Sequence, residues 1–264
     1  MSLFGRLDGS IDNEQPGGPY AHKALCNAIH AAFDDFGDDC SGAGASPVNQ
    51  GREYYEQRGD VIWEIPNREK IIALTFDDGP DPEDTPQILD LLKQYHAKAT
   101  FFVVGKQVQE HPELAKRQVA EGHELANHTF DHMYFNRRSS PEVIVRELRE
   151  TQEAIYQVTG KKTYLFRPPG GYYNDRMIQI CKKEGYLVVM WSWHQDTWDW
   201  NRPGVAKIVN KVLNNARNGD IVLMHDHVEG KSQTVDALKQ ILPELQKRGY
   251  RFVTVSELVE YNIP

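Results

Sequence analysis

The sequence has no long apolar run, and this absence argues against a membrane-spanning protein. A helix needs about 20 consecutive apolar residues to cross a bilayer. No stretch approaches that length, and the mean hydropathy is −0.60. Residues 1–10 also lack a basic region followed by about 7–15 apolar residues, so we expect no signal peptide in this chain. This fits a cytosolic protein, or an exported one whose leader is not in this sequence.

The sequence also lacks a basic patch and a cysteine framework. Its net charge is −8, and no cluster of Lys and Arg stands out, which argues against a nucleic-acid partner. The three cysteines, Cys26, Cys40 and Cys181, show no CxxC spacing and no disulfide pattern. Cys26 and Cys40 could still pair in an oxidising compartment.

What the sequence does contain changes in character at about residue 50. Residues 22–37 place apolar side chains on one helical face, and residues 41–51 have the composition of a flexible linker. We therefore expect residues 1–50 to form an appendage or linker of unknown role. Residues 51–264 are expected to form the main domain.

Seven apolar, β-rich runs alternate with helical stripes in this main domain. The runs lie at 71–76, 99–104, 123–127, 163–166, 186–191, 220–224 and 250–254. Proline and glycine stand where the intervening helices should begin and end. Regular alternation with unbroken apolar strands predicts a parallel sheet that is covered on both faces. A closed or nearly closed seven-stranded β/α barrel is the first expectation, and a doubly wound open sheet is the second.

Two adjacent aspartates, Asp77 and Asp78, follow the first of these strands in the stretch LTFDDGPDP. Like charges this close are unfavourable unless a cation or a base lies near them, and successive side chains of a strand face opposite sides. The pair has two interpretations. It belongs to a turn, since Asp-Gly and Gly-Pro follow at once, or the two acids have different functions.

Polar and ionisable residues follow five of the predicted strands, and in β/α barrels the carboxyl ends of the strands carry the active site. Among these residues, His128 and His132 are four apart, a spacing that would place both imidazoles on one face of a helix. Two histidines and one aspartate make three metal ligands with open positions, which is the catalytic arrangement. One aspartate of the pair could then bind the metal while its neighbour accepts a proton. A non-haem iron(II) oxygenase is the alternative use of such a triad.

Five segments in this order resemble the polysaccharide deacetylase family, also called the NodB homology domain or carbohydrate esterase family 4. They are TFDDGP (75–80), HTFDH (128–132), RPPGG (167–171), DTWDW (196–200) and VLMH (222–225). The resemblance covers about residues 60–260. It implies a distorted (β/α)7 barrel, a divalent metal that is usually zinc, and hydrolysis of N- or O-acetyl groups on sugars. Residues 51–264 would then be the catalytic domain.

The resemblance also implies a role for individual residues. Three residues match the metal ligands: Asp78, His128 and His132. Four match the catalytic groups: Asp77 as base, Arg167 as the arginine that positions it, His225 as acid and Asp199 as the carboxylate that tunes this histidine. Four more are expected to bind substrate: Gly170 through its backbone N–H, Tyr172, Trp200 and Leu223.

One position departs from the family pattern. The third motif usually carries an aromatic residue where this chain has Gly170, so an aromatic side chain is missing from the expected cleft. Tyr172 or Tyr173 could replace it. In the fourth motif region, Trp198 and Trp200 are expected beside the site, whereas Trp191 and Trp193 are expected in the core as strand residues.

The sequence therefore predicts a metal-dependent hydrolase. It would remove acetyl groups from N-acetylated sugars of a polysaccharide, such as chitin oligomers or peptidoglycan, by attack of a metal-bound water. Zinc is the expected metal, with cobalt or another divalent ion possible, and the expected partner is an acetylated polysaccharide or oligosaccharide. An O-acetyl xylan esterase and a catalytically inactive carbohydrate-binding protein are the alternatives. We expect a monomer that is secreted or associated with the cell wall.

Overall fold

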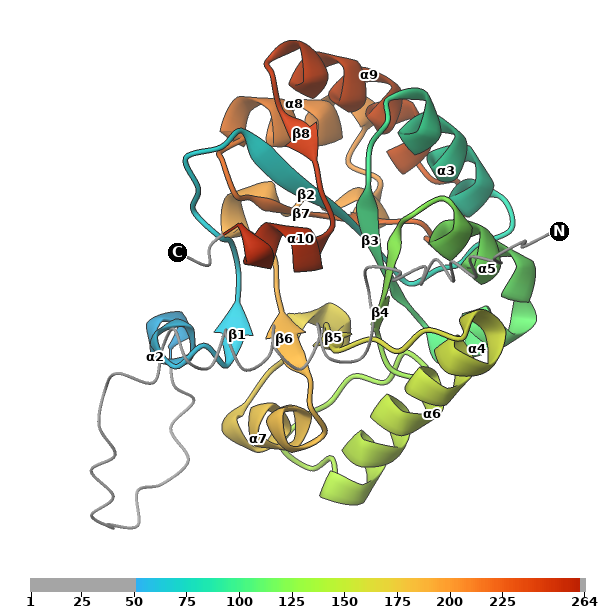
Figure 1. The fold of residues 1–264 in the computed structure, drawn as a ribbon, viewed down its shortest axis with the longest axis vertical. Coiled ribbons are helices and arrows are strands. Elements are labelled where there is room, and N and C mark those ends of the chain that lie inside the picture. The colour runs from blue at the N-terminus through green and yellow to red at the C-terminus, as the bar shows by residue number, and fades with distance from the viewer. Residues whose placement is uncertain (1–50, 262–264) are drawn as a thin grey trace, which may run out of the picture.

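The computed structural model describes residues 51–261, which form an α/β domain (Figure 1). The predicted appendage at residues 1–50 lies outside the described residues. The strands are β1 (Val61–Ile62), β2 (Ile71–Asp77), β3 (Ala99–Val103), β4 (Glu124–Asn127), β5 (Leu165–Phe166), β6 (Leu187–Val189), β7 (Ile221–His225) and β8 (Arg251–Phe252). The helices are α2 (Arg52–Gln57), α3 (Asp84–Gln94), α4 (Gly105–Glu110), α5 (Pro112–Ala120), α6 (Pro141–Thr159), α7 (Asp175–Lys183), α8 (Val205–Asn215), α9 (Thr234–Lys247) and α10 (Val255–Glu260).

Seven of the strands form one curled parallel sheet, in the order β1-β6-β5-β4-β3-β2-β7. The longer helices lie outside this curl (Figure 1). The sheet is a half-barrel, which confirms the predicted distorted β/α barrel. Among the described residues, its end strands β1 and β7 do not pair with each other, and isolated bridges at Glu64–Asp220 and Asp196–Leu223 lie near the opening instead.

Strands β5 and β6 are shorter than predicted, and two other strands, β1 and β8, differ from the prediction in their place in the sheet. Strand β1 was not predicted, because two apolar residues in an irregular segment give no periodic signal. The predicted strand at 250–254 forms only two residues, Arg251 and Phe252, which pair with Ile71 and Ile72 of β2 outside the main path.

The two faces of β2 show how the core is divided. Because successive side chains alternate, Ile72, Leu74 and Phe76 pack outward in a cluster with the helices, while Ile71 and Ala73 pack inward. The inward cluster includes Val255, Leu258 and Val259, so α10 packs against the inside of the sheet. The same alternation directs Thr75 and Asp77 inward at the carboxyl end.

Helix α6 illustrates how the sequence sets the helix ends. The Ser140 hydroxyl accepts the backbone N–H of Val143 at 3.4 Å, Pro141 occupies the first turn, and Gly160 ends the helix in the left-handed region at φ 68°. These are the residues favoured at each position. Within the described residues, no helix is both long and apolar enough to cross a bilayer.

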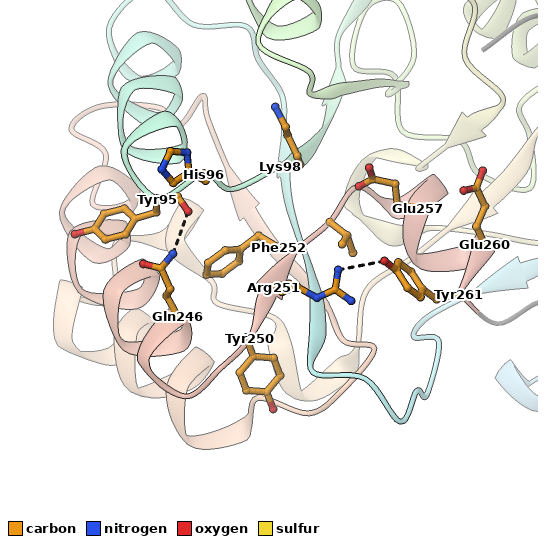
Figure 2. A pocket seen from close by; sticks show the side chains of 11 residues that line it. Tyr95, His96, Lys98, Gln246, Tyr250, Arg251, Phe252, Glu257, Glu260 and Tyr261 are labelled. Atoms are coloured by element: carbon orange, nitrogen blue, oxygen red, sulfur yellow. Dashed lines mark hydrogen bonds between the residues drawn. The ribbon is translucent and has the colours of Figure 1, made fainter. Parts of the chain in front are cut away.

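A hollow of about 630 Å³ lies at the amino ends of β3 and β8, where Figure 2 shows its lining. Several of its polar groups are used in local hydrogen bonds. Gln246 donates to the Tyr95 carbonyl at 3.3 Å, and Arg251 donates to the Tyr261 hydroxyl at 3.1 Å (Figure 2). The residues predicted to carry chemistry lie at the opposite, carboxyl ends of the strands.

Candidate active site

Strand β2 ends at the paired aspartates and turns them in different directions. Asp77 is the last residue of the strand and is buried among its inward-facing residues. Asp78 adopts a left-handed conformation with φ 78°, and its N–H donates to the Phe102 carbonyl at 3.2 Å. A left-handed backbone at a residue that is not glycine is strained and is frequent at functional sites. The turn therefore separates the two carboxylates, which allows them different functions.

His128 and His132 lie in the loop after β4, not in a helix, so the helical geometry expected from their spacing is wrong. Thr129 and His132 both have positive φ angles, 69° and 54°, and this irregular path brings the two rings together at 5.3 Å. The loop is held locally: Asn127 Oδ1 accepts the Thr129 N–H at 3.0 Å, and the Thr129 hydroxyl accepts the Met133 N–H at 2.9 Å. Two histidines four residues apart therefore meet at the site because the loop between them is strained, and not because they share a face of a helix.

Asp78 and the two histidines converge on one point. Asp78 Oδ1 lies 3.2 Å from His128 Nε2 and 3.0 Å from His132 Nε2, and one ligand atom of each residue lies within 4.8 Å of the others. Asp78 Oδ1 is buried and has no hydrogen-bond partner among the described residues. Three donors turned toward one another in this way could hold a divalent cation.

The surroundings orient and charge these groups. His128 Nδ1–H donates to the Arg167 carbonyl at 2.7 Å, which leaves Nε2 free on the side of Asp78. Burial raises the pKa of Asp78, but the imidazoles of His128 and His132 outweigh it and hold the pKa well below its usual value. Burial lowers the pKa of His132, and Asp78 more than offsets this. The carboxylate is therefore ionised, as a metal ligand must be.

Asp77 is held by a buried arginine. Arg167 Nη1 donates to Asp77 Oδ1 at 2.6 Å and to the Thr75 hydroxyl at 2.9 Å, while Nη2 donates to the Met190 carbonyl at 2.8 Å. The guanidinium also lies 3.9 Å from the centre of the Phe102 ring. Because hydrogen bonds and the Phe102 ring hold the guanidinium in place, Arg167 orients Asp77 and lies as a positive charge beside it. The second oxygen, Oδ2, lies 3.8 Å from His128 Nε2, beside the possible metal site.

His225, the last residue of β7, is paired with Asp199. The His225 Nδ1–H donates to Asp199 Oδ1 at 2.7 Å, and the His225 backbone N–H donates to Asp199 Oδ2 at 2.8 Å. The Thr234 hydroxyl and the Trp200 N–H also donate to this fully buried carboxylate, at 2.7 and 3.0 Å. Burial lowers the pKa of His225, but the charge of Asp199 outweighs it and raises the pKa to about 10. The imidazole therefore keeps its proton at neutral pH.

These groups surround a cavity of about 370 Å³, which is lined by Asp77, Asp78, His128, His132, Tyr134, Gly170, Tyr172, Trp191, Asp196, Trp200, Leu223 and His225. Of the eleven residues predicted as catalytic, metal-binding or substrate-binding, Arg167 and Asp199 are not in the lining, and Trp198, which was expected beside the site, is exposed and does not line the cavity. Arg167 and Asp199 lie behind Asp77 and His225. The structure thus brings all eleven predicted site residues together, although their roles stay predictions.

Three lining residues were not predicted as site residues: Tyr134, Trp191 and Asp196. Asp196 stands in the fourth motif, so its position after a strand was an available signal. Trp191 was expected in the core, yet it is only partly buried and reaches the cavity. Trp193 was also expected in the core, and this was wrong, because it is 63% exposed in a short 3₁₀ turn (Trp193–Gln195) after β6.

Asp226, the residue that follows β7, fixes the loop that presents Asp78. Asp226 Oδ1 accepts the Gly79 N–H at 3.1 Å, Oδ2 accepts the Thr85 hydroxyl at 2.7 Å, and its own N–H donates to the Asp77 carbonyl at 3.2 Å. Burial raises the pKa of Asp226 to about 7. Asp226 thus ties the two aspartates and the following loop to the end of β7.

Comparison with known proteins decides the family. A model described as polysaccharide deacetylase matches residues 64–189. A peptidoglycan-N-acetylglucosamine deacetylase of Bacillus cereus is 55% identical over 210 residues, which cover 80% of this chain and 98% of that protein. The chain belongs to the polysaccharide deacetylase family.

Solved structures of this family, also named carbohydrate esterase family 4, agree with the fold. The peptidoglycan N-acetylglucosamine deacetylase Bc1960 matches with a TM-score of 0.75 and 33% identity, covering 79% of this chain and 97% of that one. A family 4 acetyl xylan esterase from Clostridium thermocellum, solved with cobalt, matches with a TM-score of 0.67 and 33% identity over 74% and 93% of the two chains. Other relatives are longer: the chain spans 44% of the peptidoglycan-N-acetylglucosamine deacetylase PgdA of Listeria monocytogenes, to which it is 39% identical over 81% of its own length.

Proposed function

We propose that the protein is a metal-dependent deacetylase that removes the acetyl group from N-acetylglucosamine residues of peptidoglycan. The observation that carries the chemistry is one cavity lined by a possible Asp–His–His metal site, an arginine-held carboxylate and a carboxylate-paired histidine. The substrate is supported by the 55% identity to the Bacillus cereus enzyme named for this reaction, over nearly its whole length.

The metal that Asp78, His128 and His132 would hold is zinc, because two imidazoles and one carboxylate are typical donors of a catalytic zinc site. Cobalt, which the related acetyl xylan esterase holds, is the alternative divalent ion. When bound, such an ion lowers the pKa of a coordinated water and polarises the acetyl carbonyl.

Asp77 acts as the general base. Arg167 occupies its Oδ1 at 2.6 Å, so Oδ2 is the oxygen left to accept a proton from the attacking water. Asp77 lines the cavity, and its Oδ2 lies 3.8 Å from His128 Nε2, beside the donor group of Asp78, His128 and His132. A positioned carboxylate of this kind contributes on the order of 10²–10⁴ in rate.

His225 acts as the general acid. Its Nδ1 is engaged by Asp199 at 2.7 Å, which leaves Nε2 as the nitrogen that can donate to the departing amine. An amide breaks only when its nitrogen leaves with a proton, and the raised pKa of about 10 keeps His225 charged for this step.

The cavity wall would receive the acetyl group. Leu223 and Trp200 offer apolar surface to the methyl group, and the backbone N–H of Gly170 is the protein donor expected for the developing oxyanion. One such donor is worth about 3 kcal/mol. Tyr172, at the same cavity, is placed to contact the sugar.

The protein would act at the cell wall, because peptidoglycan lies there, and so it would be exported.

Acetate release from defined substrates tests the proposal. Purified protein loaded with zinc should release acetate from peptidoglycan fragments, and mass spectrometry should place the mass loss of one acetyl group on N-acetylglucosamine and not on N-acetylmuramic acid. Release from acetylated xylan alone would favour the esterase alternative. Tight binding of glycan without release from any substrate would favour an inactive carbohydrate-binding protein.

A further inference from the structure

Gly170 creates a gap in the expected cavity wall, because a family aromatic side chain is missing there. The residue lies in a short 3₁₀ turn (Pro169–Gly171) after β5, with φ 64° and ψ 10°. This left-handed conformation favours glycine. Gly170 therefore contributes its backbone to the cavity lining but no side chain.

The space beside Gly170 is filled from another loop. A Cβ atom added to Gly170 would lie 2.6 Å from Cε1 and 3.1 Å from Cδ1 of Tyr134, and 3.3 Å from Cδ2 of Tyr172. The first of these distances is too short for any real Cβ contact. The Tyr134 ring thus occupies the direction in which a side chain at position 170 would leave the backbone.

Tyr134 is held on one side and open on the other. Its ring packs edge-on against His132 at 5.1 Å and against Tyr172 at 6.3 Å between ring centres. Even so, 53% of Tyr134 and 63% of Tyr172 are exposed, and both line the cavity. Within residues 51–261 neither hydroxyl makes a hydrogen bond to another residue, so both rings and both hydroxyls are accessible to a ligand. An aromatic ring fixed by packing at the mouth of a polar cavity suits the apolar face of a sugar.

Tyr173, the other aromatic considered from the sequence, has a different role. Its ring packs edge-on against Tyr55 at 5.5 Å and Trp63 at 5.7 Å. It does not line the cavity. Tyr173 therefore packs the loop after β5 against α2 and the segment that follows β1.

We propose that Tyr134 is a substrate-binding residue that replaces the aromatic side chain missing at Gly170 and stacks on the sugar that carries the acetyl group. This rests on the proposed function, since it assumes that the cavity binds an N-acetylated sugar. The replacement comes from the loop that also carries His132, so sugar binding and the metal site share one segment of chain.

The test measures binding separately from turnover. In the Asp77→Asn background, which should retain metal without hydrolysing substrate, the dissociation constant of a chitin oligomer is measured by calorimetry. Adding Tyr134→Ala should weaken binding about tenfold, as the loss of a stacked ring predicts. Tyr134→Phe, which keeps the ring, should stay within about twofold. Tyr156→Ala is the matched control, because Tyr156 is an exposed tyrosine on α6 that does not line the cavity.

The same variants with Asp77 intact show whether Tyr134 contacts the sugar or only supports the position of His132. Tyr134→Ala should raise KM about tenfold with little change in kcat and with unchanged zinc affinity. A fall in zinc affinity that accounts for the lost activity would show that Tyr134 only supports His132, and would overturn the proposal. So would an unchanged dissociation constant. If no variant binds the oligomer and the unaltered protein releases no acetate, the proposed function fails first, and the assignment of Tyr134 to sugar binding fails with it.

Discussion

The two neighbouring aspartates show how single residues divide the chemistry. Asp77 ends a strand on its inner face and is held by Arg167, whereas Asp78 turns through a left-handed backbone to meet two imidazoles. Their chemical identity is the same, and only their surroundings assign one to the metal and the other to a proton.

Asp77→Asn tests this division. The amide keeps the shape of the side chain but cannot accept the proton, so we expect kcat to fall by about 10²–10⁴ while zinc is still bound. Acetate release and a zinc titration on the same sample measure both. Asp78→Asn is the matched variant and should lose zinc as well as activity. An Asp77→Asn protein with full turnover would contradict the base assignment.

Asp199→Asn tests how the acid is kept charged. The negative charge of Asp199 raises the pKa of His225 to about 10, so removing it should lower that pKa by about 1 to 3. His225 must be protonated to act, and activity is lost as the pH rises through its pKa. The alkaline limb of the kcat/KM profile should therefore move to lower pH in the variant. Thr234→Val, which removes one neutral hydrogen bond to the same carboxylate, should move it less. An alkaline limb that stays in place would remove Asp199 from this role.

At the scale of elements, alternation and chain turns place the site. The strands other than β1 and the four longest helices were predictable from apolar periodicity and from Pro and Gly at helix ends, and so was the convergence of polar residues at the carboxyl ends of the strands. The path of the loops was not predictable. His128 and His132 meet through positive φ angles, and Tyr134 fills the gap at Gly170 from a different loop. Such contacts depend on tertiary packing, for which a single sequence has no periodic signal.

The loop after β2 makes a testable contact with the end of β7. A Cβ atom on Gly79 would lie 2.2 Å from Asp226 Oδ2, in a buried site. Gly79→Ala should therefore destabilise the protein by about 1–3 kcal/mol and weaken zinc binding at the adjacent Asp78. Thermal unfolding and zinc titration measure these effects. In an Asp226→Ala background the same substitution should cost much less, since the clashing carboxylate is gone. An equal loss of unfolding free energy in both backgrounds would show that the clash with Asp226 is not what destabilises Gly79→Ala.

His123, between α5 and β4, makes the fold sensitive to acid. Burial lowers its pKa from 6.5 to about 4, and its ring packs edge-on against Phe101 at 5.6 Å. The unfolded chain binds this proton below about pH 6.5 and the folded protein only below about pH 4, so acid favours unfolding in this window. The free energy of unfolding should lose up to about 3 kcal/mol there. His123→Phe should remove that loss in denaturant titrations at pH 7 and pH 4.5, and an unchanged difference between the two pH values would contradict it.

At the scale of the whole molecule, the half-barrel has distinct ends. The amino end is packed by α10 and carries a hollow whose polar groups are used in local hydrogen bonds (Figure 2), whereas the carboxyl end gathers side chains from five separate segments into one cavity. Residues far apart in sequence, such as Asp78 and His225, become neighbours only because parallel strands end at the same edge. The overall fold is therefore a precondition of the chemistry.

A single cation held by Asp78, His128 and His132 is what would make this cavity a deacetylase. The most direct measurement strips the protein with a chelator and titrates zinc back while acetate release from N-acetylglucosamine oligomers is followed. We expect activity to be lost on stripping and to return in proportion to zinc, saturating at one ion per chain, with no return in His128→Ala. Full activity in the metal-free protein, or zinc-dependent activity that survives His128→Ala, would show that a cation held by these three residues is not what drives acetate release.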